Sequence, residues 1–319
     1  MRVHLTFDVE VWCPGWNALD ATFPVAFERY VWGRSMRGDY ALPRNLEILQ
    51  RHGLVGVFFV EPLFSLRFGS QYLKTITSMI QGAGQDVQLH LHPEWVDEIR
   101  PAIIPDSALK RQHLTDYTAA EQATLLACGK RLVEAATGQP VTAFRAGGYA
   151  VNRDSYRGLA ASGLHIDSSL NATYDRSKGS LGDPRQLHQR QRIDGVDVHP
   201  VTVFLDGLGR PRHCQVGACS FAELRDVLDR AQGQGHDEVV LVSHNFELLK
   251  PSSVEPDLIV ERRFESLCAY LASHPRRFQV GPFPPPSDAP QPLAPVPLLQ
   301  ADLWATARRY VEQTRRRLG

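Results

Sequence analysis

Residues 3–11 read VHLTFDVEV, with an apolar side chain at every second position. This alternation predicts a β-strand whose apolar face is buried. Its other face would carry His4, Thr6, Asp8 and Glu10. Side chains two residues apart point to the same face, so Asp8 and Glu10 would emerge together, about 6.5–7 Å apart. Two inward carboxylates are costly unless a cationic group meets them. The stretch therefore predicts either a cation site or the exposed polar face of an edge strand.

The rest of the chain alternates between strand-like and helix-like segments, which predicts an α/β fold with a mostly parallel sheet. Seven strands in all fit a distorted (β/α)7-type barrel better than a closed eightfold one. Two helix starts carry capping boxes, Thr118 with Glu121 and Ser220 with Glu223. The other strands are expected at 54–60, 86–92, 141–145, 164–168, 196–204 and 238–244, and the helices near 43–52, 71–84, 118–137, 153–162, 220–234 and 257–273.

The barrel would occupy residues 1–280 as a catalytic domain. A proline-rich linker follows at 281–298, and an amphipathic helix is expected at 299–319. We expect this helix to dock on the barrel or on a second copy of the chain, which would give a homodimer. Its apolar stripe consists of Leu303, Ala307, Tyr310 and Val311.

Composition restricts the class of protein. The chain has 319 residues and is 43% hydrophobic, and its 35 Lys and Arg balance 35 Asp and Glu. Zero formal charge argues against binding nucleic acid through bulk electrostatics. The five cysteines are scattered, without a CxxC pair, which is typical of reduced thiols. The sequence enters a strand at once and has no run of 18 apolar residues, so we expect a cytoplasmic protein without a membrane span.

A second stretch, DVQLHLHP at residues 86–93, places two imidazoles at the end of a strand. His90 and His92 share one face, opposite the leucines. A strand that runs into a turn has no structural need for two histidines. With Glu10 they would form a two-histidine, one-carboxylate set, which leaves open coordination positions for water and substrate. The pattern predicts either a divalent metal site, with Zn²⁺ as the expected ion, or two histidines that are satisfied within the core.

Three further predicted strands end in uncommon polar residues. Arg145 ends one, and the glycines that follow it would let backbone N–H groups approach a ligand. Asp167 and His244 end two others. In a barrel, these ends converge on one mouth, where catalytic sites are assembled. Trp12 and Trp95 closely follow the metal-bearing strands; they would either stack on sugar rings or pack the long loops.

The order of these blocks resembles the polysaccharide deacetylases, the NodB-homology group, similar to carbohydrate esterase family 4. The resemblance covers residues 2–280. It depends on five blocks: TFDVE (6–10), HLHP (90–93), FRAGGY (144–149), DSS (167–169) and LVSH (241–244).

The resemblance implies that Asp8 is the catalytic base and that Glu10, His90 and His92 hold the metal. Two departures from the family are visible. The family more often has Asp where Glu10 stands, frequently adjacent to the base. Its usual second histidine lies four residues after the first, and that position is Glu94 here. The HxHP pattern makes His92 the expected ligand, with Glu94 as the alternative.

The remaining roles concern the other strand ends. Arg145 resembles the arginine that orients the base, and Asp167 resembles the carboxylate that holds the last histidine. His244 resembles the general acid that protonates the leaving amine. We expect backbone N–H groups near Gly148 or Tyr149 to stabilise the oxyanion.

The resemblance implies a metal-dependent hydrolase that removes an N-acetyl group from an amino sugar. We expect a nucleotide-linked or lipid-linked sugar of surface polysaccharide biosynthesis, of the O-antigen or capsule type. Three alternatives stay open. The same site would serve a C–N hydrolase of a small non-sugar amide, a non-catalytic sugar-binding relative would keep the fold, and a mononuclear iron oxygenase would use only Glu10, His90 and His92.

Overall fold

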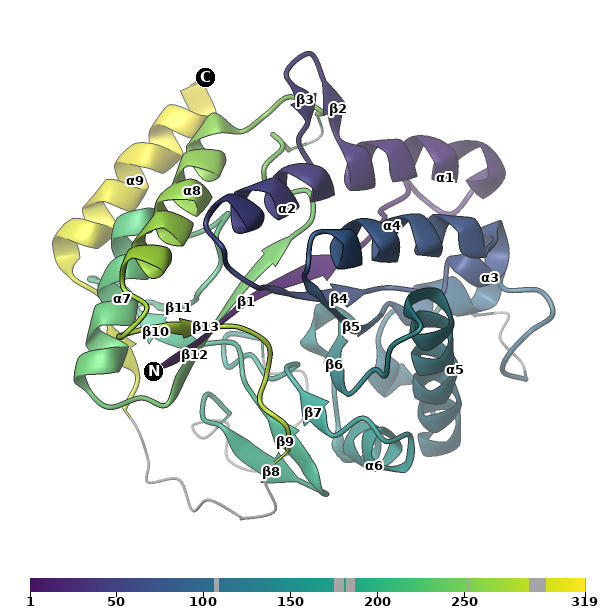
Figure 1. The fold of residues 1–319 in the computed structure, drawn as a ribbon. Helices are drawn as coiled ribbons and strands as arrows, with labels where there is room; N and C mark the ends of the chain where they lie inside the picture. The colour runs from purple at the N-terminus through teal and green to yellow at the C-terminus, as the bar shows by residue number, and fades with distance from the viewer. Residues whose placement is uncertain (106–108, 175–180, 182–186, 252, 287–296, 319) are drawn as a thin grey trace.

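A strongly curved, mostly parallel sheet forms the centre of the molecule, with helices packed around it (Figure 1). The strand order is β12-β1-β4-β5-β6-β7-β9-β8, and β13 also pairs with β1. Only the pair β8 and β9 is antiparallel among the pairs of this sheet in the described residues. The computed structural model describes residues 1–105, 109–174, 181, 187–251, 253–286 and 297–318.

The elements follow the predicted alternation of strands and helices, except that the strand expected at 196–204 is interrupted, with Val196–Val198 in the large sheet and Val203–Leu205 outside it. The strands of the large sheet are β1 (Arg2–Val9), β4 (Val57–Val60), β5 (Asp86–Leu91), β6 (Ala143–Ala146), β7 (Ile166–Asp167), β8 (Gln191–Ile193), β9 (Val196–Val198), β12 (Glu238–His244) and β13 (Gln279–Val280). Short strands outside it are β2 (Arg34–Ser35), β3 (Gly38–Asp39), β10 (Val203–Leu205), β11 (Pro211–His213) and β14 (Leu299–Gln300). The helices are α1 (Leu19–Phe27), α2 (Leu42–Arg51), α3 (Ser65–Phe68), α4 (Ser70–Gly82), α5 (Ala119–Thr137), α6 (Arg153–Ala161), α7 (Phe221–Gly233), α8 (Leu258–Ser273) and α9 (Leu303–Leu318), with short helical turns η1 (Glu28–Trp32), η2 (Pro93–Glu98), η3 (Leu114–Asp116) and η4 (Gly147–Tyr149). Both predicted capping boxes are present, at the starts of α5 and α7.

Strand β1 lies between β12 and β4, one strand in from the edge of the sheet. Its apolar face packs on the outer helices: Phe7 stacks on Phe58 of β4, with 4.5 Å between ring centroids, and meets Phe264 of α8 edge-on at 5.7 Å. Its polar face is also buried, because Asp8 is 3% and Glu10 6% exposed. The alternative of an exposed edge strand is therefore wrong.

The inside of the curved sheet holds a small apolar cluster rather than a full core. Its members are Val57, Phe59, Ala143, Ile166, Val240 and Phe283. Irregular segments cover the free edge of β12, since Thr202 donates its N–H to the Val240 carbonyl at 3.0 Å and Val216 donates to Val242 at 3.1 Å. The curled, mostly parallel sheet confirms the predicted distorted barrel, and among the described residues this edge is covered without a regular strand.

The C-terminal helix α9 packs beside α7 and α8 (Figure 1). It begins at Leu303, later than predicted, because Leu299–Gln300 pairs with β10. The predicted stripe does not dock on the barrel, because Leu303 and Val311 are 56% and 52% exposed, and its docking on a second copy stays a prediction. The helix instead buries Arg309, which pairs with the buried carboxylates of Asp206 and Glu223. Of the predicted linker, residues 287–296 lie outside the described residues.

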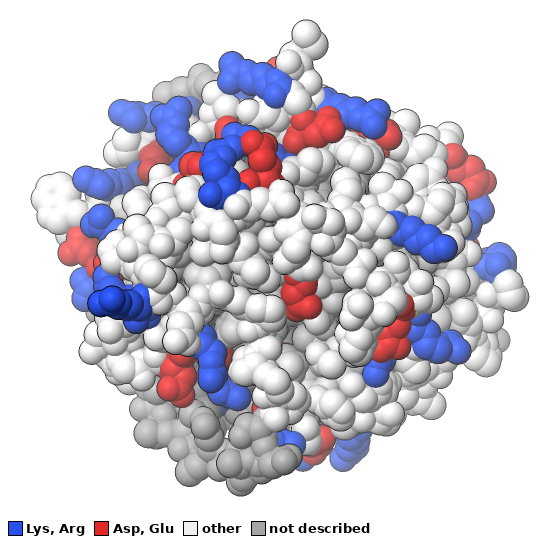
Figure 2. Space-filling model, in the orientation of Figure 1, with Lys and Arg blue, Asp and Glu red and all other residues white. Residues whose placement is uncertain are grey.

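The surface carries charges of both signs. On the face drawn in Figure 2, Lys and Arg are interspersed with Asp and Glu rather than gathered in one field of a single sign. Within the described part of the chain, no helix combines the length and the apolar character needed to cross a bilayer.

Candidate metal centre and catalytic site

The carboxyl ends of four strands bring six of the predicted site residues to one end of the barrel. Parallel strands place such ends on the same side of the sheet. Two groups of possible metal ligands lie here, with ligand atoms within 4.8 Å of one another: Glu10, His90 and His92, and also Asp8, Glu10 and His244. The strand ends are those of β1 (Asp8, Glu10), β5 (His90, His92), β6 (Arg145) and β12 (His244).

The geometry of His90 and His92 fits a bound cation. Glu10 Oε1 lies 2.8 Å from His90 Nε2 and 2.9 Å from His92 Nε2. His90 Nδ1 lies 2.7 Å from the Arg145 carbonyl oxygen, which can only accept, so Nδ1 carries the hydrogen. A neutral His90 then directs a bare nitrogen lone pair at a carboxylate. Such a contact needs a positive charge, either a proton on Nε2 or a cation held by the two groups, and the backbone bond orients the ring as in protein metal sites.

The charges of this group depend on one another. Burial favours the neutral form of Glu10, yet His92 and His90 hold the pKa of its carboxyl well below the usual value. Burial likewise disfavours a charged His92, but Glu10 and Glu94 raise its pKa well above the usual value. Glu10, His90 and His92 thus form a buried group in which positive charge balances the Glu10 carboxylate. A bound divalent ion would supply that positive charge in place of a proton on an imidazole.

Glu94, the alternative ligand, lies behind His92. Its Oε1 is 3.1 Å from His92 Nδ1, the nitrogen that faces away from Glu10. A carboxylate in this place orients a ligand histidine and raises its basicity. The geometry therefore favours Glu10, His90 and His92 as the ligand set.

Arg145 is held rigidly against Asp8. Its Nη1 donates to Asp8 Oδ1 at 2.8 Å, while Nε and Nη2 donate to the carbonyl and hydroxyl oxygens of Ser168, both at 2.9 Å. The guanidinium lies over the Phe59 ring, 4.4 Å from its centroid. Arg145 is fully buried, so removing either charge of the pair would leave the other uncompensated.

His244 has a different partner from the one predicted. Its Nδ1 lies 2.8 Å from Glu247 Oε1. Burial disfavours the imidazolium, but Glu247, Glu10 and Asp8 together raise the pKa of His244 to about 9. Glu247 is fixed in turn, because it accepts hydrogen bonds from Gly217 N at 2.6 Å and from the side chain of Gln215.

Asp167 does not hold His244, which corrects the predicted pairing. It accepts hydrogen bonds from the Tyr156 hydroxyl at 2.9 Å and from the hydroxyl and N–H of Ser169 at 2.5 and 3.0 Å. It is fully buried, and burial raises its pKa to about 6. Its contacts fasten β7 to α6.

Asn245, like Glu247, is a site residue that was not predicted from the sequence. Its N–H donates to the Asp8 carbonyl at 3.2 Å, and its Oδ1 accepts from the Glu10 N–H at 3.1 Å. It therefore fixes the backbone between the two carboxylates. The signal available in the sequence was its position directly after His244, since a polar side chain there faces the end of the neighbouring strand.

The turn η4 after β6 has an unusual backbone. Gly148 and Tyr149 have φ values of 60° and 58°, and the left-handed region is costly for tyrosine. Gly147 allows the close approach of His92: a Cβ there would lie 2.8 Å from the Leu91 carbonyl oxygen and 2.9 Å from the His92 ring. Strain of this kind gathers at functional sites, which agrees with the oxyanion position expected at Gly148 or Tyr149.

A cavity of about 380 Å³ opens beside the metal ligands. Trp12 is 42% exposed, and its Nε1 donates to Glu10 Oε2 at 2.6 Å. Trp95 is 3% exposed and packs edge-on against Trp16, Phe64 and Phe68, which favours the alternative in which it packs the loops. The cavity is lined by Glu10, Val11, Trp12, Cys13, Trp16, Glu61, His92, Glu94, Trp95, Lys110 and Gln112.

Comparison with known proteins gives no match to a family model and none to a curated protein. Solved structures do match. A Mycobacterium smegmatis protein provisionally named as a polysaccharide deacetylase superposes with a TM-score of 0.50 at 18% identity, over 90% of this chain and 94% of that one. The chain has a polysaccharide deacetylase fold.

Two other solved structures match at lower TM-scores. A family 4 carbohydrate esterase from Streptomyces lividans, in complex with acetate, has a TM-score of 0.42 at 14% identity over 92% of this chain and 98% of that one. A mutant CE4 family pseudoenzyme with restored enzymatic activity has a TM-score of 0.43 at 16% identity over 88% of this chain. The present chain spans 65% of the length of that pseudoenzyme.

Proposed function

We propose that this chain is a metal-dependent deacetylase that removes the acetyl group from an N-acetylated amino sugar. The observation that carries the proposal is the pair of imidazoles whose Nε2 atoms lie 2.8 and 2.9 Å from Glu10. Beside this set stand a carboxylate paired with an arginine and a histidine paired with a carboxylate. Hydrolysis of an amide needs a base, an acid and a centre that polarises the carbonyl, and these groups supply all three.

Glu10, His90 and His92 would hold the ion, for which their donor set favours Zn²⁺. When bound, such an ion activates a water molecule for attack and polarises the amide carbonyl. Asp8, paired with Arg145, accepts a proton from the attacking water. His244, kept protonated by Glu247, donates its proton to the departing nitrogen. Water and amide thereby give acetate and a free amine.

Arg145, the turn at Gly148 and Tyr149, and Trp12 would each have a different role in the reaction. Arg145 has a positioning role, because its contacts to Ser168 and Phe59 leave one hydrogen bond for Asp8. Backbone N–H groups of the strained turn at Gly148 and Tyr149 would stabilise the developing oxyanion. Trp12 presents an exposed ring at the cavity, suited to the apolar face of a sugar.

The finer identity of the substrate is also a proposal: a nucleotide-linked or lipid-linked sugar of surface polysaccharide biosynthesis, processed in the cytoplasm. A cavity of about 380 Å³ is near the lower end of small-molecule sites, which favours a single sugar unit over a polymer. All five cysteines are free thiols, which supports a reducing compartment. The barrel of residues 1–280 would act as the catalytic domain, and the exposed stripe of α9 supports a homodimer.

The test is an assay for released products. The chain, depleted of metal and reloaded with Zn²⁺, is incubated with UDP-N-acetylglucosamine and, separately, with small cyclic and linear amides. We expect acetate and free amine in equal amounts, lost with chelator and restored by Zn²⁺. Ammonia release from the small amides without acetate would instead establish the C–N hydrolase. Sugar binding without turnover would establish a non-catalytic relative.

A further inference from the structure

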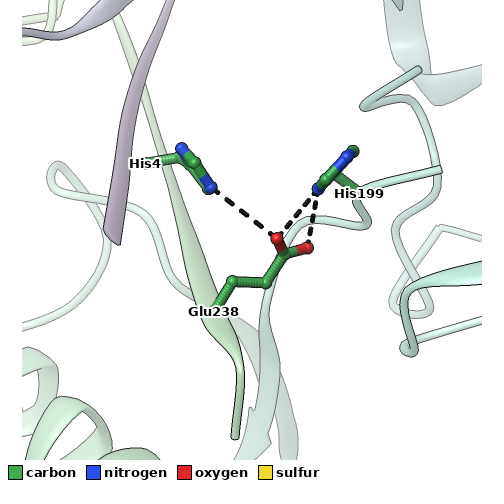
Figure 3. Close-up of side chains that lie close together, drawn as sticks. All are labelled: His4, His199 and Glu238. Atoms are coloured by element: carbon green, nitrogen blue, oxygen red, sulfur yellow. Dashed lines mark hydrogen bonds and ion pairs between the residues drawn. The ribbon is translucent and has the colours of Figure 1, made fainter. Parts of the chain in front are cut away.

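A second set of buried histidine and carboxylate side chains lies inside the barrel, away from the candidate catalytic site. It consists of His4 on β1, Glu238 at the start of β12 and His199 just after β9 (Figure 3). His4 shares a face of β1 with Asp8 but lies four residues earlier, about 13 Å along the strand. His4 and His199 are 1% and 0% exposed, and the Glu238 side chain is 9% exposed.

His4 repeats the arrangement of His90. Its Nδ1 lies 2.8 Å from the Gly281 carbonyl oxygen, which can only accept, so this nitrogen carries the hydrogen. Its Nε2 faces Glu238 Oε2 at 3.6 Å and has no hydrogen-bond partner among the described residues. A neutral His4 would thus direct a buried, bare lone pair at a buried carboxylate, which is unfavourable without a cation between them.

Glu238 and His199 complete a compact set of donors. His199 Nδ1 lies 2.9 Å from both carboxylate oxygens of Glu238. One ligand atom from each of the three residues falls within 4.8 Å of the others. Neighbouring ligands of a tetrahedral zinc ion are about 3.3 Å apart, which follows from bond lengths of about 2.0–2.1 Å. Small side-chain movements would therefore place all three on one ion.

The set is apolar on one side and reached by water on the other. The Phe283 ring packs against both imidazoles, with centroids 4.4 Å from His4 and 4.9 Å from His199. Glu238 also lines a cavity of about 100 Å³, together with Thr202, and this cavity would admit a water molecule. Three protein ligands and one water would complete the four-coordinate shell of a zinc ion.

The position of the set explains what an ion would do for the fold. His199 precedes the segment that closes the barrel, in which Thr202 donates to Val240 of β12 at 3.0 Å. His4 and Glu238 belong to β1 and β12, which are neighbours in the sheet. One ion would join β1, β12 and the closing segment, where the described residues offer no regular strand.

We propose that His4, His199 and Glu238 bind a second divalent cation, Zn²⁺ by the chemistry of the donors, and that this ion stabilises barrel closure rather than taking part in hydrolysis. The site is independent of the proposed catalytic ion, since the two sets share no residue. The competing arrangement is an imidazolium at His4 paired with Glu238, with no metal.

The test counts zinc ions. The unaltered chain, the double variant His90→Asn with His92→Asn, and Glu238→Gln are equilibrated with Zn²⁺, dialysed and measured by plasma mass spectrometry. We expect two ions for each unaltered chain, one for the double variant and one for Glu238→Gln. Glu255→Gln, whose carboxylate is 70% exposed, is the matched control and should keep two.

Two further measurements separate the site from the catalytic one. Co²⁺ added to the double variant should give the visible absorption of a tetrahedral ion, and Zn²⁺ should raise its Tm. Glu238→Gln, if folded, should keep its deacetylase activity. The proposal is overturned if the folded double variant binds no zinc, or if Glu238→Gln binds as much as the unaltered chain. Because the double variant keeps His4, His199 and Glu238, its result decides even if Glu238→Gln fails to fold.

Discussion

Asp8 and His244 are partners in the register of two adjacent parallel strands, β1 and β12. Each has its own partner of opposite charge: Arg145 lies 2.8 Å from Asp8, and Glu247 lies 2.8 Å from His244. The proposed base and acid therefore come from neighbouring strands, and each is paired with its own residue of opposite charge. Burial disfavours a charged His244, but Glu247, Glu10 and Asp8 raise its pKa to about 9, so this residue can act as an acid at neutral pH.

Asp8→Asn should lower the rate of acetate release by about 10²–10⁴-fold, the usual contribution of a general base. The amide cannot take a proton from water, while the metal ligands stay in place. The measurement is kcat, with zinc content and circular dichroism on the same samples. Asp20→Asn, at a carboxylate that is 76% exposed, is the control and should leave kcat unchanged. A variant Asp8→Asn within a few-fold of the unaltered chain would refute the base assignment.

Glu247→Gln should move the alkaline limit of activity to lower pH. The pKa of His244 is raised to about 9, so its proton is present below that pH and is lost as the pH rises through it. Without the charge of Glu247 the pKa falls toward the ordinary value of about 6.5, and activity at pH 8 is lost. The measurement is kcat against pH.

Asp167→Asn is the matched comparison for that profile. Asp167 contacts Tyr156 and Ser169 rather than His244, so its loss should change stability and leave the alkaline limit in place. A shift of the limit in Asp167→Asn, with none in Glu247→Gln, would restore the pairing predicted from sequence.

The contrast between Asp167 and Glu247 shows which features of the site can be predicted from the sequence. The alternation in residues 3–11 predicts both the strand and the common direction of Asp8 and Glu10, because the period of a strand is local. Whether Asp167 reaches His244 depends on strand order, and β1, β4, β5 and β6 lie between β12 and β7. Glu247 was the better candidate on local grounds, since it follows His244 by three residues in the same turn.

The burial of the polar face of β1 was also hard to predict, because its polar side chains pair with residues of other strands. The alternation alone does not distinguish an exposed polar face from one turned into a barrel, because both give the same pattern. The buried polar face of β1 depends on Arg145, His90 and Glu238, which belong to other strands. The five sequence blocks include Arg145 and His90 and place both correctly at strand ends. None of His4, His199 and Glu238 lies in these blocks.

Gly147→Ala should weaken zinc binding at the candidate catalytic site by about 10–100-fold, the range for a disturbed orientation of a ligand. The added Cβ would lie 2.9 Å from the His92 ring and 2.8 Å from a backbone oxygen, so His92 must shift. The measurement is the Kd for Zn²⁺ by competition with a chelator. Gly233→Ala, where a Cβ meets nothing within 4 Å, is the control. Equal Kd values for the two variants would show that His92 does not depend on this contact.

Arg309→Ala should destabilise the chain by about 3–5 kcal/mol, because it leaves two buried carboxylates uncompensated. Arg309 lies 2.8 Å from both Glu223 and Asp206, which are 0% and 1% exposed, and these charges explain why α9 docks through an arginine rather than its apolar stripe. The measurement is the free energy of unfolding in urea. Val311→Ala, at an exposed position of the stripe, should change it by less than about 0.5 kcal/mol in a dilute monomer. A larger loss for Val311→Ala than for Arg309→Ala would mean that the stripe, and not the buried arginine, holds the helix in place.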